Sequence, residues 1–151
     1  MNHRHVRMPI RLSPSHERWV YVIGSLLLLT GLGWLVCHFL LAVPNAFGET
    51  QHPLEPLWLK LHGGAAMAFL IVIGSLLPIH ITRAWRLGKN RTSGAVMLFL
   101  LALIILTGYG LYYLGDEQTR PWISLVHWLV GLVVAALLPL HVWLGQRGRG
   151  R

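Results

Sequence analysis

The stretch that decides the fold runs from Pro121 to Gln146, PWISLVHWLVGLVVAALLPLHVWLGQ. It is long enough to cross a membrane and almost wholly apolar, yet it contains two histidines, His127 and His141. Fourteen residues separate them, so both should lie on one helical face, about 21 Å apart along the axis. Because a hydrocarbon core is about 30 Å thick, we expect one histidine toward each side of the membrane. Imidazoles are costly in lipid unless they face a bundle interior and have a partner.

The rest of the chain has the same apolar character and indicates an integral membrane protein. Of its 151 residues, 54% are hydrophobic and only 12% are charged. Apolar runs predict an all-α bundle of four membrane spans in one domain, residues 19–146. The expected spans cover about 19–43, 58–85, 93–114 and 121–146. Residues 1–18 and 147–151 are expected to be basic tails, and the first span is expected to remain uncleaved.

The charges predict the orientation of the spans. The net charge of +8 comes from residues that flank the apolar runs, which is typical of membrane topology and not of nucleic-acid binding. Eleven Lys and Arg residues fall on one side, against only Lys60 and Arg120 on the other. The eleven precede the first span (Arg4, Arg7, Arg11, Arg18), follow the second (Arg83, Arg86, Lys89, Arg91) or follow the fourth (Arg147, Arg149, Arg151). The positive-inside rule therefore predicts that both termini are cytoplasmic.

The two halves of the chain look like copies of one helical hairpin. Thr30-Gly31 in the first span matches Thr107-Gly108 in the third. The pattern Leu-Leu-Pro-x-His ends at His80 in the second span and at His141 in the fourth. Both copies would enter the membrane from the cytoplasm, so the second and fourth spans should run parallel.

Parallel spans should bring the histidines together in two levels. His62 and His80 lie eighteen residues apart, about five turns, and so share a face. We expect His62 to pair with His127 near the outer side, and His80 with His141 near the inner side. Two neutral imidazoles at each level suit a six-coordinate haem b, so the four histidines are the expected iron ligands of two haems. Zinc would need two further ligands at each level, and the sequence has only one cysteine, Cys37.

Other residues remain alternatives or accessories to this arrangement. The two histidines of the second span are eighteen residues apart, but those of the fourth span are only fourteen apart. In straight helices this difference leaves an axial mismatch of about 6 Å, which a proline kink or helix tilt could partly absorb. His38 and His16 are therefore rival ligands for the outer and inner haem, although His38 is expected to be structural. Arg83, one turn past His80, could bind the inner haem propionates or could simply set the topology. Tryptophans at the span ends predict contact with membrane lipid.

Several segments resemble one known family. They are Arg11-Leu12-Ser13-Pro14, Glu17-Arg18-Trp19, Thr30-Gly31, Leu61-His62-Gly63-Gly64, Arg83-Ala84-Trp85-Arg86 and the histidines of the fourth span. Together the chain resembles the bacterial cytochrome b561-type superfamily, which includes the cytochrome b subunits of formate dehydrogenases and nickel–iron hydrogenases. The resemblance implies a bacterial inner membrane, two b haems ligated in part by His127 and His141, and a quinone. Many members take an inner ligand from a histidine just after the Glu-Arg pair. Here Val20 and Tyr21 stand there, and His80 is the natural replacement, as in small four-span relatives.

The expected function is electron transfer through the two haems, between a periplasmic redox protein and the quinone pool. The periplasmic partner would be a cytochrome c or a dehydrogenase subunit. The chain would then be the cytochrome b subunit of an oxidoreductase and not a complete enzyme. One alternative is a self-contained superoxide:quinone oxidoreductase or a small ferric reductase. Another is a haem-free transporter or assembly factor.

Overall fold

Four long helices form the molecule, as the apolar runs predict. The computed structural model describes residues 13–45, 48–88 and 91–147. The long helices are α1 (Pro14–Phe39), α2 (Glu55–Leu76), α4 (Arg91–Tyr113) and α5 (Arg120–Arg147). Each is long and apolar enough to cross a membrane. The prediction of an all-α protein with four membrane-spanning helices is therefore confirmed.

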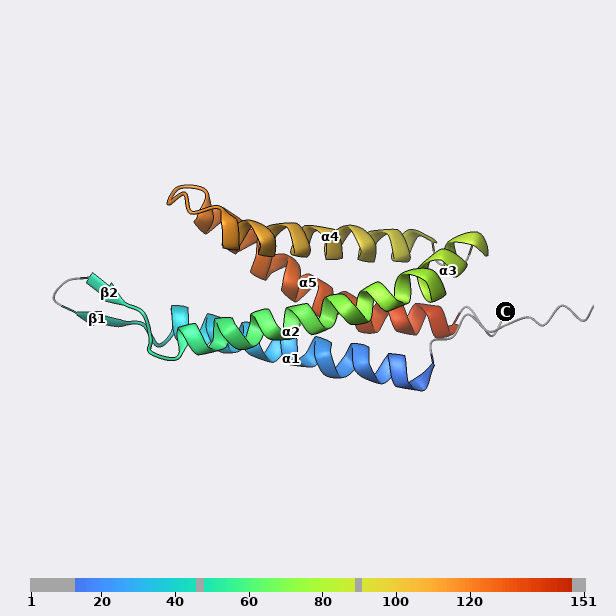
Figure 1. Cartoon of the computed structure of the whole chain (residues 1–151), viewed down its shortest axis with the longest axis horizontal. Helices are drawn as coiled ribbons and strands as arrows, with labels where there is room; N and C mark the ends of the chain where they lie inside the picture. Colours follow the sequence, from blue (N-terminus) through green and yellow to red (C-terminus); the bar gives the residue numbers. More distant parts are fainter. Residues whose placement is uncertain (1–12, 46–47, 89–90, 148–151) are drawn as a thin grey trace, which may run out of the picture.

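The long helices pack in two pairs, and the two pairs are in contact with each other. α1 packs against α2, α4 packs against α5, and α5 also contacts α1 (Figure 1). In Figure 1, α5 runs obliquely from α4 toward α1, so it joins the two pairs. Large apolar side chains are exposed on every long helix, which suits a chain whose surrounding solvent is lipid.

Helix α1 begins earlier than the sequence suggested. Ser13 is its N-cap, and the Ser13 side chain accepts a hydrogen bond from the backbone N–H of His16. Pro14 occupies the first helical position, where its missing N–H costs nothing. The predicted helix start at residue 19 is therefore wrong, because residues 14–18, expected in the tail, belong to α1. His16 lies in the first turn of α1, not ahead of it.

The loop between α1 and α2 contains a short β-hairpin. Strand β1 (Val43–Asn45) pairs antiparallel with β2 (Gly48–Thr50), with Val43 opposite Thr50. The apolar run predicts a first span that reaches residue 43, but α1 ends at Phe39. In Figure 1 the hairpin projects beyond the ends of α1 and α2, at the left of the view.

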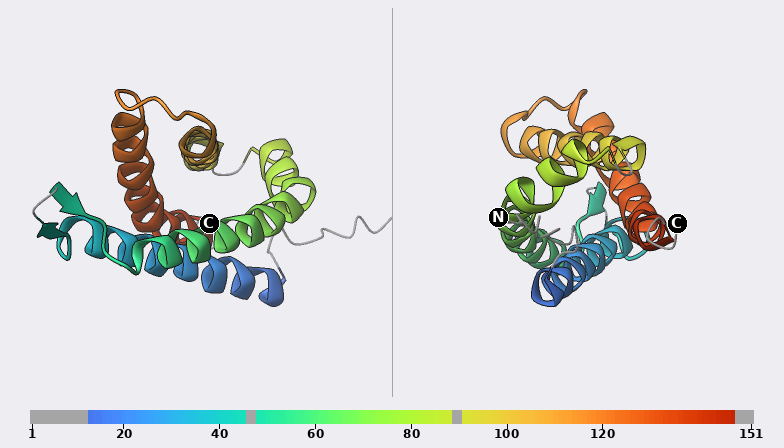
Figure 2. Two further views of the ribbon diagram at one scale, coloured as in Figure 1. Left: turned by 60° about the vertical axis from the view of Figure 1, so that its left-hand side comes forward. Right: turned by 90° about the vertical axis from the view of Figure 1, so that its right-hand side faces the viewer.

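The second span is not one regular α-helix. After Leu76 it continues as a π-helical segment, η1 (Leu77–Ile81), and then as α3 (Thr82–Arg86). Pro78 lies within η1 and cannot donate a backbone hydrogen bond, which favours the irregular turn. The Thr82 hydroxyl donates to the Leu77 carbonyl at 2.6 Å across this turn. Figure 2 shows the chain bending here, so that α3 leaves the α1–α2 pair and approaches α4.

Two tight turns connect the remaining elements. Gly88, with φ +68°, follows α3 in a conformation that favours glycine. Arg91 then donates from Nε and Nη2 to the carbonyl of Trp85, at 3.0 and 2.8 Å. Between α4 and α5, the Thr119 hydroxyl and backbone N–H donate to the Asp116 carboxylate. These hydrogen bonds, first that of the hydroxyl, lower the pKa of Asp116.

Candidate functional site

The His62 ring is held in one orientation by residues of α1. Its Nδ1 lies 3.1 Å from the Thr30 hydroxyl and 3.1 Å from the carbonyl of Leu27. The Thr30 hydroxyl has one proton, which it donates to the Leu26 carbonyl at 2.8 Å. A carbonyl can only accept, so Nδ1 of His62 must carry the hydrogen and donate it. The lone pair of the neutral ring is therefore on Nε2.

The His127 ring is held in the same way by residues of α4. Its Nδ1 lies 2.9 Å from the Thr107 hydroxyl. Thr107 donates its own proton to the carbonyl of Leu103 at 2.8 Å. In both rings, therefore, the threonine hydroxyl has its proton on a backbone carbonyl of its own helix. Nδ1 is again the donor, and the lone pair of the ring is again on Nε2.

A glycine after each threonine lets the imidazole approach the neighbouring helix. A Cβ atom built on Gly31 would lie 3.3 Å from Cε1 of His62. A Cβ atom built on Gly108 would lie 3.2 Å from Cε1 of His127. Both distances are shorter than an ordinary carbon–carbon contact of about 3.5–4.0 Å. The sequence shows the threonine–glycine pairs as a repeat, but it does not show that the threonine hydrogen-bonds the histidine or that the glycine makes room for its ring.

The two anchored rings face each other across the pairs of helices. Their centroids are 6.2 Å apart and their planes are at 84°. A metal bound by both rings through Nε2 would separate the centroids by about 6.3 Å, given bonds of about 2.0–2.1 Å and a nitrogen about 1.1 Å from its centroid. The expected proximity of His62 and His127 is thus present, with a centroid separation close to that value.

The second pair lies where the chain bends. His80 belongs to η1, and among the described residues its buried Nδ1 has no hydrogen-bond partner. His141, on α5, has its Nδ1 3.2 Å from the Ser93 hydroxyl. The two rings are close enough to interact electrostatically. Arg83, half-buried in α3, follows His80 by three residues. His80 and His141 therefore lie within electrostatic range of each other, and their rings are less firmly anchored than those of the first pair.

The two rival histidines have other contacts. His38 Nδ1 lies 3.1 Å from a carboxylate oxygen of Glu55, which is only 3% exposed. Trp34 stacks on His38, with ring centroids 4.6 Å apart. This clamp between α1 and the start of α2 agrees with a structural role for His38. His16 Nδ1 lies 2.9 Å from the Ser13 hydroxyl.

The histidines gather as pairs and not as larger clusters. Within residues 13–45, 48–88 and 91–147, no three His, Cys, Asp or Glu side chains form a group that could hold a metal ion. His62 lies beside His127, and His80 lies within electrostatic range of His141. In comparisons with protein-family models, curated proteins and solved structures, nothing matches this chain.

Proposed function

We propose that the protein is a dihaem cytochrome b that carries electrons across a bacterial inner membrane. The single observation that carries this proposal is the anchored pair of His62 and His127. Both rings donate from Nδ1 to a threonine, and His62 also to a carbonyl, which leaves Nε2 as the ligand atom. Histidines that bind metals almost always donate their other N–H to such acceptors.

The number of ligands favours haem over a simple metal ion. A structural zinc site needs four protein ligands, and each pair offers two. A haem iron receives four nitrogens from its own macrocycle and needs two axial ligands from the protein. His62 and His127 would hold one haem, and His80 and His141 the other, and Arg83 of α3 would bind a propionate of the inner haem. Bound haem supplies one-electron chemistry, and the chain supplies ligation, spacing and electrostatics.

The shape of the second span supports the inner pair. Straight helices would leave an axial mismatch of about 6 Å between the two levels. The π turn of η1 takes up one extra residue and so removes about 1.5 Å of that mismatch. The bend that starts there directs the chain sideways and not along the α2 axis, which reduces the mismatch further (Figure 2).

The matching contacts in the two halves support an origin in two repeated hairpins. In each half, the first helix carries a threonine that hydrogen-bonds a histidine of the second helix and a glycine that contacts the same ring. With both termini cytoplasmic, His62 and His127 lie toward the periplasm. Electrons would pass between a periplasmic partner, either a cytochrome c or a dehydrogenase subunit, and quinone in the membrane. The protein would be a subunit of an oxidoreductase.

Haem content of the purified protein tests this proposal. We expect a Soret band and two haems per chain by pyridine haemochrome assay. Acid should extract both, because the sequence has no Cys-x-x-Cys-His motif for covalent attachment. One haem per chain would refute the dihaem arrangement. No haem at all would favour the transporter or assembly-factor alternative.

A further inference from the structure

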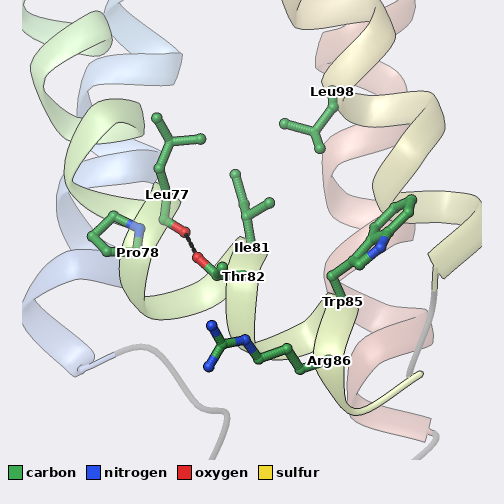
Figure 3. Close-up of a pocket in the computed structure, with 7 residues that line it drawn as sticks. All are labelled: Leu77, Pro78, Ile81, Thr82, Trp85, Arg86 and Leu98. Atoms are coloured by element: carbon green, nitrogen blue, oxygen red, sulfur yellow. Dashed lines mark hydrogen bonds between the residues drawn. The ribbon is translucent and has the colours of Figure 1, made fainter.

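A second candidate site lies at the bend of the second span, on the side that faces α4 (Figure 3). Its cavity, about 590 Å³, opens between the η1–α3 segment and α4. That volume is within the range of about 300–1,000 Å³ found for pockets that hold small organic molecules. Leu77, Pro78, Ile81 and Leu98 form its apolar walls. Figure 3 shows Leu77 and Ile81 on one side and Leu98 of α4 on the other.

The rim of the cavity is polar and cationic. It is formed by Thr82, Trp85 and Arg86. Thr82 has already donated its hydroxyl proton to Leu77, and Arg86 is the cation among the described residues that line the cavity. In Figure 3 the guanidinium of Arg86 extends beneath Thr82, at the end of the cavity opposite Leu98. Leu77 and Trp85 are 49% and 51% exposed, which indicates that the cavity opens to the surroundings of the bundle.

Trp85 is held in place by the following turn. Arg91 binds the Trp85 carbonyl through two nitrogens, and its guanidinium carbon lies 5.8 Å from the centroid of the Trp85 ring. A cation at this distance is attracted to the aromatic face. One side of the indole is therefore occupied by Arg91. The rim is consequently a defined structure and not a loose group of side chains.

We propose that this cavity binds one anionic phospholipid of the cytoplasmic leaflet. The phosphate would bind the Arg86 guanidinium, and the start of an acyl chain would lie against Leu77, Ile81 and Leu98. Charge complementarity favours this occupant, because basic cavities beside membrane helices attract anionic headgroups. The Arg86 guanidinium carries a full positive charge, which a phosphate neutralises and the uncharged carbonyl oxygens of a quinone do not. The lipid site needs only the cytoplasmic placement of this end and does not depend on haem.

The bound lipid would also support the bend that carries His80. Leu77 and Ile81 are the first and last residues of η1, and both line the cavity. A chain packed against them would fill space beside a helical segment that lacks regular α-helical hydrogen bonding. Occupancy of the site should therefore raise the thermal stability of the protein.

Lipid binding to delipidated protein in an uncharged detergent tests the proposal. The probes are phosphatidylglycerol and phosphatidylcholine with identical acyl chains, followed by native mass spectrometry. We expect one phosphatidylglycerol per chain to be retained in preference to phosphatidylcholine. Arg86→Gln should weaken phosphatidylglycerol binding about fivefold, the contribution of one basic residue near a membrane surface. Arg18→Gln removes an exposed cation near the N-terminus of α1 and should leave phosphatidylglycerol binding unchanged.

A second variant tests the apolar part of the cavity. Leu98→Trp fills the cavity without altering charge and should also weaken phosphatidylglycerol binding. Equal retention of the two lipids by the wild type would overturn the proposal, and so would an equal effect of Arg18→Gln and Arg86→Gln. Loss of ubiquinone binding in Leu98→Trp with phosphatidylglycerol retention intact would show that the cavity is a quinone site instead.

Discussion

Replacement of Thr107 by valine tests the atom that orients His127. Valine keeps the shape of threonine but removes the oxygen that accepts the Nδ1 hydrogen at 2.9 Å. The substitution therefore removes one hydrogen bond from the His127 ring. A net hydrogen bond contributes about 0.5–1.5 kcal/mol, which corresponds to about two- to twelvefold weaker haem binding.

The assay is a titration of haem-depleted protein with haem, followed by the Soret absorption. Ser75→Ala is a matched control, because its hydroxyl donates to the Val72 carbonyl within α2 at 2.7 Å. Thr107→Val should weaken binding of one haem and leave the other unchanged, whereas Ser75→Ala should alter neither. If the two variants bind haem equally well, the threonine does not orient His127, and the main support for the proposed function is lost.

Three further predictions concern the second pair, the packing and the loop. His80→Ala should remove one haem or convert it to high spin, whereas His16→Ala should leave both low-spin signals in the electron paramagnetic resonance spectrum; exchanged outcomes would assign the inner ligand to the first helix. Gly33→Ala should destabilise the detergent-solubilised protein by about 1–3 kcal/mol, because the new Cβ would lie 2.7 Å from the indole ring of Trp58 on α2. Gly74→Ala is the control in thermal unfolding, because a Cβ there would have nothing within 4 Å. An equal loss of stability in the two variants would contradict the packing argument. The ionised Asp116 carboxylate should stabilise the protein above the ordinary Asp pKa of 3.8, and this contribution should vanish as the pH falls through the lowered pKa. In unfolding experiments across pH, Asp116→Asn should therefore be less stable than the wild type only above that pKa. A stability difference that stays constant with pH would refute the prediction.

Much of the architecture follows from local patterns along the chain. Four apolar runs predict four spans, because any helix crossing a hydrocarbon core must bury about twenty apolar residues in it. The spacing of His62 and His127 from their helix starts also follows from the sequence, since each comes six residues after a proline. These features depend on composition and helical period alone, so they could be predicted residue by residue.

Errors arose where a boundary depends on a cap or on an irregular turn. The start of α1 was placed at residue 19 because the apolar run begins there, but the Ser13–Pro14 pair starts the helix earlier. The second span was treated as one helix, and the π segment at Pro78 was missed. A proline in an apolar run predicts some distortion, but whether it kinks the helix or widens one turn depends on the neighbouring helices.

Sequence alone therefore determined the number of spans, the charge asymmetry that predicts their orientation, and the level of each histidine along its helix. Only the tertiary structure decided what each imidazole touches. Thr30 and His62 are 32 residues apart, and Ser93 and His141 are 48 apart, so no helical period relates them. Their contacts depend on how the helices cross and on which face of each helix turns inward. Those choices come from packing across the whole bundle, and they give the Nδ1 atoms of His62, His127 and His141 their partners.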